Sequence, residues 1–206
     1  MAGSPVRSRR VSIALEPAAI EVGDRQFLVA LSRTALSVAA RAQPTSLLAD
    51  AMERARLMPL WHRRAACFVT LFERHELRGC MGVLDPSTRL PEAVVQATVA
   101  SALDDPRFWP VEQSELRRMR LDISVMGSLT ATDDPSALVL GVDGVAINSQ
   151  GRRALLLPEV ATEHGLNEPE LWRTLCRKAG LDADAWRRPG ANLLVFRTVR
   201  FGGPAS

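Results

Sequence analysis

The stretch from Leu77 to Gly82 reads LRGCMG and lies where a β-strand is expected. Strand interiors favour β-branched and aromatic residues, whereas glycine weakens a strand because it packs nothing and costs backbone entropy. The two glycines, Gly79 and Gly82, therefore indicate a bulge or another group that lies close to the backbone. The interpretation of the rest of the chain starts from this strand.

The segment before it, residues 67–72, reads CFVTLF and predicts a second strand. The polar residues 73–76 join the two, which predicts a β-hairpin with a four-residue loop. If Phe72 pairs with Leu77, Val69 lies opposite Cys80, unless a bulge at either glycine shifts the register. In this register one face of the hairpin carries Cys67, Val69, Leu71, Arg78, Cys80 and Gly82.

Composition and charge describe an ordinary globular protein. The 206 residues are 47% hydrophobic and 24% charged, enough for a full core. The net charge of +3 comes from Arg7, Arg9 and Arg10, because without them 23 basic residues face 23 acidic ones. A neutral body gives no nucleic-acid footprint, and no apolar run is long enough to cross a membrane. Three cysteines form neither a disulfide framework nor a CxxC pair, so we expect a cytoplasmic protein, with residues 1–23 as a flexible tail.

The remaining patterns predict an α+β fold with a mainly antiparallel sheet and flanking helices. Helices are expected at residues 24–40, 46–58, 91–103 and 167–178. Beyond the hairpin, strands are expected at residues 120–129, 144–148, 153–157 and 193–201. Hairpins interrupted by helices, without regular βαβ alternation, favour this class over a parallel sheet.

LRGCMG resembles the LRGCIG signature of the AMMECR family, with methionine in place of the isoleucine. Further segments match in the family's order: DPRF at 105–108, ISVM at 123–126, GV at 144–145, LLLPEV at 155–160 and LCRKAG at 175–180. The resemblance covers about residues 24–201. It implies one domain, residues 24–206, with a larger lobe built from both chain ends, a smaller inserted lobe, and a ligand groove between them.

The family has no established catalytic activity. Its microbial members occur with a Memo-like protein and a radical S-adenosylmethionine protein, as component A of the three-part AmmeMemoRadiSam system. The resemblance therefore implies a binding or adaptor module with these two proteins as candidate partners, whose groove takes a partner segment or small ligand. The residues expected to line the groove are Leu77, Gly79, Met81, Gly82, Asp105, Arg107 and Phe108.

Cys80 and Arg78 are the candidate catalytic residues of an alternative, enzymatic interpretation. A guanidinium beside a thiol favours the nucleophilic thiolate, so Cys80 could act as a nucleophile or covalent carrier. Free cysteine is among the residue types most often buried, which favours the alternative that Cys80 is a small buried residue that only packs. Arg78 could hold an anionic group, or it could pair with an acid such as Asp85 or Asp122 and stabilise the fold.

Other residues carry less signal. The three histidines lack metal-ligand spacing, and no HExxH, P-loop, GxGxxG or GxSxG motif is present, so the sequence predicts neither a metal nor a cofactor. Asp122 and Ser124 alternate with apolar residues, which solvent exposure would explain. Cys67 and Cys176 are expected in the core. The sequence leaves the oligomeric state open.

Overall fold

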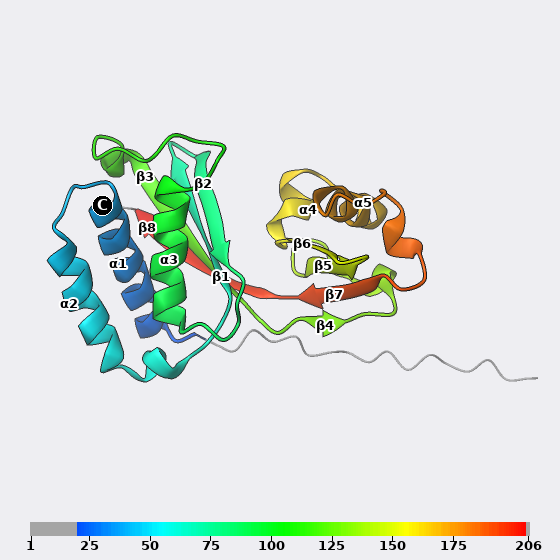
Figure 1. Cartoon of the computed structure of the whole chain (residues 1–206), viewed down its shortest axis with the longest axis horizontal. Helices are drawn as coiled ribbons and strands as arrows, with labels where there is room; N and C mark the ends of the chain where they lie inside the picture. Colours follow the sequence, from blue (N-terminus) through cyan, green and yellow to red (C-terminus); the bar gives the residue numbers. More distant parts are fainter. Residues whose placement is uncertain (1–19, 205–206) are drawn as a thin grey trace, which may run out of the picture.

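Two antiparallel sheets organise the described part of the chain, residues 20–204, in the computed structural model (Figure 1). This confirms the predicted α+β class. Both ends of the described chain lie in the larger lobe, and the smaller lobe is inserted between them. Residues 1–19 of the predicted tail lie outside the described residues, and the first helix begins at Val22, two residues before its predicted start.

The larger lobe is a four-stranded sheet with helices on one face. Its strands, in spatial order, are β2 (Glu76–Val83), β1 (Cys67–Glu73), β3 (Met119–Met126) and β8 (Thr198–Pro204). Its helices are α1 (Val22–Ala39), α2 (Thr45–Arg56) and α3 (Leu90–Leu103). Helices α1 and α3 pack on the sheet and bury the main core, while α2 packs against α1. The opposite face of the sheet looks toward the smaller lobe (Figure 1).

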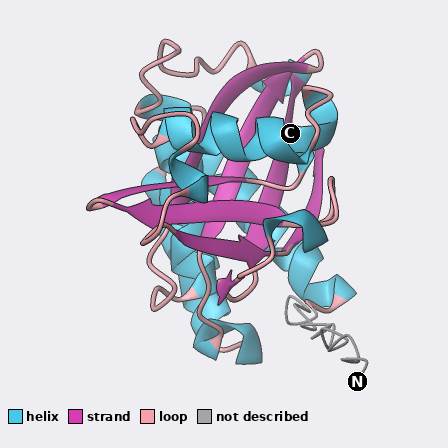
Figure 2. Cartoon of the chain, turned by 90° about the vertical axis from the view of Figure 1, so that its right-hand side faces the viewer, coloured by secondary structure: helices cyan, strands magenta, loops and turns pink. Residues whose placement is uncertain are grey.

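The smaller lobe has its own four-stranded sheet and two short helices. Its strands, in spatial order, are β4 (Thr130–Ala131), β7 (Asn192–Phe196), β5 (Gly144–Ser149) and β6 (Arg152–Leu156). Helices α4 (Glu159–Glu163) and α5 (Glu168–Lys178) cover one face, where Trp172 stacks on Trp186 at 6.1 Å. Figure 2, seen from this side, shows the strands of the two sheets running across one another.

The last predicted strand, residues 193–201, is two strands in the structure. β7 pairs with β5 in the smaller lobe, and β8 pairs with β3 in the larger one. The chain passes between the lobes at Arg197, whose carbonyl accepts a hydrogen bond from the N–H of Gly127 on the outgoing connection. Residues 193–201 stay rich in strand-forming residues through the crossing, with no glycine or proline, so nothing local indicates that the partner sheet changes.

The central hairpin contains a bulge at Arg78 that shifts the predicted register by one residue. Beyond the bulge Thr70, not Val69, lies opposite Cys80. The predicted common face is therefore wrong at this point. Cys80 faces away from the helices, and Gly79 faces them.

The hairpin turn is also tighter than predicted. Only Arg74 and His75 form it, and both have positive φ, at 49° and 79°. Two-residue turns of this kind match the right-handed twist of the flanking strands, so the strands continue through Glu73 and Glu76.

Candidate functional site

The face of the larger sheet that looks toward the smaller lobe carries the thiol of Cys80. Cys80, Thr70 and Asp122 form one row across β2, β1 and β3, and side chains directly opposite one another on neighbouring strands lie about 5 Å apart. The hydroxyl Oγ1 of Thr70 is 3.3 Å from the Cys80 Sγ. Cys80 is half-buried, whereas Cys67 and Cys176 are fully buried, as predicted for those two. The Cys80 thiol is thus reachable and has a hydroxyl beside it.

Strand β2 is the edge of its sheet, so some of its peptide groups have no strand partner. At Cys80 the loop after α3 supplies one. Asp105 accepts the Cys80 N–H at 2.8 Å, and the Arg107 Nη2 donates to the Cys80 carbonyl at 3.4 Å. Arg107 also holds both Asp105 oxygens, through Nε at 2.9 Å and Nη2 at 2.7 Å. The Asp105–Arg107 pair takes the place of a neighbouring strand at this peptide.

The electrostatics of Asp105 follow from these bonds. The pKa of Asp105 is lowered to about 2, first by hydrogen bonds from Arg107 and then by the Cys80 N–H, although burial opposes them. The residue is only 4% exposed. Asp105 is therefore a fixed, buried negative charge, while more than half of the Arg107 side chain remains in contact with solvent.

Arg78 is engaged in holding a loop. Its Nε and Nη2 donate to the two carboxylate oxygens of Glu115 at 2.7 and 3.1 Å, and its Nη1 donates to the Trp109 carbonyl at 2.9 Å. The Arg78 and Glu115 side chains are only 14% and 15% exposed. Burial raises the pKa of Glu115, but the hydrogen bonds from Arg78 and the Glu112 N–H, together with the charges of Arg78 and Arg118, outweigh it and the pKa is lowered. Of the two predicted roles for Arg78, the structure shows the ion pair, with an acid that the sequence did not single out.

The two glycines of LRGCMG permit close approaches, as predicted. A Cβ on Gly79 would lie inside van der Waals contact with the Ser101 carbonyl oxygen, at the end of α3. The Ser101 hydroxyl accepts the Met81 N–H at 2.9 Å. A Cβ on Gly82 would lie 2.5 Å from the Phe68 ring, which fills that space. The glycines therefore serve packing of α3 on one face and of Phe68 on the other.

The other predicted groove residues divide between the two sides of β2. Met81 lies on the α3 side and Leu77 is exposed near the hairpin turn. The Phe108 ring lies near two guanidinium groups, with its centre 5.9 Å from that of Arg78 and 5.4 Å from that of Arg107. The structure therefore brings Phe108 and Arg107 together with Cys80 through the Asp105 loop, and it places Leu77 and Met81 elsewhere.

The smaller lobe contributes Lys178, the only lysine of the chain, which the sequence did not single out as a site residue. Its Nζ donates to the Leu155 carbonyl at 3.0 Å. Surrounding protein lowers the pKa of Lys178; the Cys80 charge raises it and the Arg107 charge lowers it. Lys178 keeps contact with solvent and lies within electrostatic range of both residues. The match of LCRKAG to the family pattern was the one available signal.

An ion-pair network that links the two lobes was also not predicted from the sequence. Arg200 of β8 donates to Asp122 at 2.7 Å and to Glu159 of α4 at 3.4 Å. Solvent exposure does not explain Asp122 and Ser124, because both are buried on the face toward the smaller lobe. The expectation was wrong because the polar face of this strand is buried against the smaller lobe. A strand with one buried polar face has the same alternating sequence as a strand with one exposed face.

The space between the lobes also opens away from Cys80. A cavity of about 680 Å³ lies farther along the hairpin and is lined by none of the residues predicted for the groove. Within residues 20–204 no group of three or more histidine, cysteine or acidic side chains is placed to hold a metal ion. In the same range, no helix combines the length and apolar character needed to cross a membrane.

Comparisons with known proteins agree with this architecture. A family model described as AMMECR1 matches residues 29–201. A protein of Methanothermobacter thermautotrophicus is 33% identical over 180 residues, 84% of this chain and 91% of the relative. Protein TV1384 of Thermoplasma volcanium is 31% identical over 175 residues, 82% of this chain and 87% of the relative. The crystal structure of the uncharacterized protein PH0010 from Pyrococcus horikoshii is similar with a TM-score of 0.75 at 29% identity, over 86% of this chain and 91% of that one.

Proposed function

Since the chain belongs to the AMMECR1 family, we propose that it is a binding module whose inter-lobe face at Cys80 receives a small anionic ligand or an acidic partner segment. The observation that carries the proposal is the setting of the thiol. Arg107 from the larger lobe and Lys178 from the smaller one both lie within electrostatic range of Cys80. A group that reaches the thiol is therefore in the field of two cations, of which, within residues 20–204, Arg107 is paired with Asp105 and Lys178 is not paired with an acid.

The family context makes a Memo-like protein and a radical S-adenosylmethionine protein the first partners to test. The same proposal places the chain in a reducing compartment such as the cytoplasm. Three free thiols persist most readily in such a setting.

A second candidate function is catalysis with Cys80 as nucleophile or covalent carrier. The accessible thiol beside the Thr70 hydroxyl favours it. Because Arg78 is engaged with Glu115, an anionic group would be held by Arg107 and Lys178 instead. A Cys80→Ala protein that still binds its partner would support the binding module, whereas loss of a measured turnover in that variant would support the enzyme.

The experiment that tests the site compares two alkylating reagents. Cys80 should react faster with anionic iodoacetate, relative to neutral iodoacetamide, in the native protein than in the unfolded chain, because two cations attract the anion. Peptide mass spectrometry follows each cysteine separately. Cys67 and Cys176 are internal controls, because burial raises the pKa of Cys67 to about 12 and also raises that of Cys176.

A matched pair of variants distinguishes a specific effect of Lys178 from the effect of the protein's overall charge. Lys178→Gln should lower the iodoacetate rate at Cys80 selectively, and Arg177→Gln, an exposed neighbour with the same change of charge, should not. An equal reagent ratio in native and unfolded protein would show that the face at Cys80 does not attract anions. The binding proposal would then fail.

A further inference from the structure

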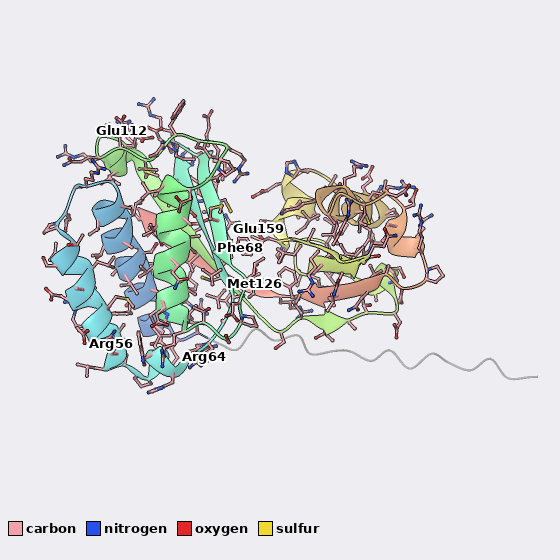
Figure 3. The ribbon with its side chains drawn as sticks, in the orientation of Figure 1. Arg56, Arg64, Phe68, Glu112, Met126 and Glu159 are labelled. Atoms are coloured by element: carbon pink, nitrogen blue, oxygen red, sulfur yellow. The ribbon has the colours of Figure 1, made fainter. Side chains whose placement is uncertain are left out.

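The cavity between the lobes lies beyond Phe68, on the far side of that ring from Cys80. Cys80 is in the row of Thr70, the next row holds Gly82 and Phe68, and the cavity begins after it at Leu84. Figure 3 labels Phe68, Met126 and Arg64 along this side of the larger lobe. Its volume of about 680 Å³ falls in the range of small-molecule sites, roughly 300–1,000 Å³.

One wall of the cavity is the face of the smaller sheet that the helices do not cover. Strand pairing arranges this face in two rows across β7, β5 and β6. The apolar row is Leu194, Ala146 and Leu155, and the polar row is Asn192, Asn148 and Arg153. The larger lobe adds apolar surface on the other side, including Leu84, which is 57% exposed, and the connection between the lobes adds Leu129, which is 50% exposed. The cavity thus has apolar walls and one polar margin.

The charge of the lining is one-sided. Among the described residues, the lining includes Arg64 and Arg153 and no acidic residue. Arg64 donates to the Ser87 carbonyl, so it is partly engaged. The Arg153 guanidinium and the carboxamides of Asn148 and Asn192 make no hydrogen bond or ion pair with other residues in the range 20–204. Arg153 lies at one end of the polar row, with Asn148 next to it and Asn192 beyond. One unpaired cation beside amide groups matches the single charge and planar shape of a carboxylate better than a phosphate dianion.

We propose that this cavity binds a small monocarboxylate with an apolar body. The carboxylate accepts hydrogen bonds from Arg153 and the two asparagine amides, and the body lies on Leu155 and Leu194. The site is separate from the face at Cys80 and does not depend on the function proposed there.

The test is an octanoate titration of the full-length, isotope-labelled protein, followed by NMR, with 1-octanol as the uncharged control. Octanoate should shift the backbone signals of the two rows, and Arg153→Gln should weaken octanoate binding by about tenfold without changing octanol binding. Arg177→Gln makes the same charge change on an exposed position of the smaller lobe and should leave octanoate binding unchanged.

A second pair of variants guards against a folding artefact. Leu129→Glu places an acid on the exposed rim of the cavity and should abolish octanoate binding in a folded protein, while Leu140→Glu, on an exposed loop of the smaller lobe, should not. The proposal is overturned if octanoate shifts no signal of the two rows. It is also overturned if Arg153→Gln weakens octanol as much as octanoate, or if Leu129→Glu binds octanoate normally.

Discussion

Replacing Asp105 with asparagine should destabilise the fold by about 2–3 kcal/mol at pH 7, and the loss should shrink as the pH falls. Asp105 accepts the Cys80 N–H and both arms of Arg107 at the edge of the larger sheet. Its pKa is lowered from an ordinary 3.8 to about 2, chiefly by hydrogen bonds from Arg107. Because the residue is only 4% exposed, solvent screening does little to reduce this effect.

The magnitude follows from the shift in pKa. A displacement of about 1.8 units corresponds to about 2.4 kcal/mol, at about 1.4 kcal/mol per unit. Since the pKa in the folded protein lies below that in the unfolded chain, the stabilisation is complete above about pH 5 and is lost as the pH falls toward 2. At pH 3 about half of it remains, so the difference between wild type and Asp105→Asn should narrow by about 1 kcal/mol.

Urea unfolding at pH 7 and pH 3 measures this difference directly. Asp104→Asn is the matched control, because Asp104 is exposed and should change stability by less than about 0.5 kcal/mol at either pH. Two results would refute the reasoning: a loss below about 0.5 kcal/mol in Asp105→Asn at pH 7, or a difference from wild type that does not change with pH.

Two further predictions concern LRGCMG itself. Gly79→Ala should cost about 3 kcal/mol in urea unfolding, because its Cβ would collide with a backbone oxygen of α3 that cannot move aside. Gly23→Ala in α1 has nothing within 4 Å and should instead stabilise by about 0.5–1 kcal/mol, so equal effects would contradict the packing argument. A double-mutant cycle on Arg78 and Glu115 should give a coupling of about 1–3 kcal/mol, since the pair is bidentate and largely buried. A coupling near zero would mean that the ion pair does not hold the loop.

What the sequence predicted well was local. The helix at Glu168–Lys178 begins and ends where its caps indicate, because Asn167 and Glu170 form a reciprocal capping box within one turn. The hairpin was also found from its own residues. Its register was not predicted, because the bulge at Arg78 shifts the strand pairing by one residue. The bulged Arg78 binds Glu115, which lies 37 residues later in the chain. No local pattern records a partner at that distance.

The candidate site shows the same division. Arg107 and Phe108 were predicted because they lie in the segment DPRF, which matches the family pattern, and the structure places that segment beside Cys80. Lys178 enters only when the smaller lobe is in place against the larger one, and the contacts that hold the lobes together come from both. Local sequence patterns predict the elements of each lobe separately. They do not predict how the two lobes pack against each other.

The structure also separates what LRGCMG does for the fold from what it offers to a ligand. Gly79 admits α3, Gly82 admits Phe68, and Arg78 secures the loop through Glu115. The fold therefore requires each of these three residues, whether or not the protein has an activity. The thiol of Cys80 has no such structural role. Its side chain faces the smaller lobe, and only its peptide group is needed at the sheet edge. Loss of function in Arg78 or Gly79 variants therefore reports on folding, and the chemistry of the face is tested at Cys80 and Lys178.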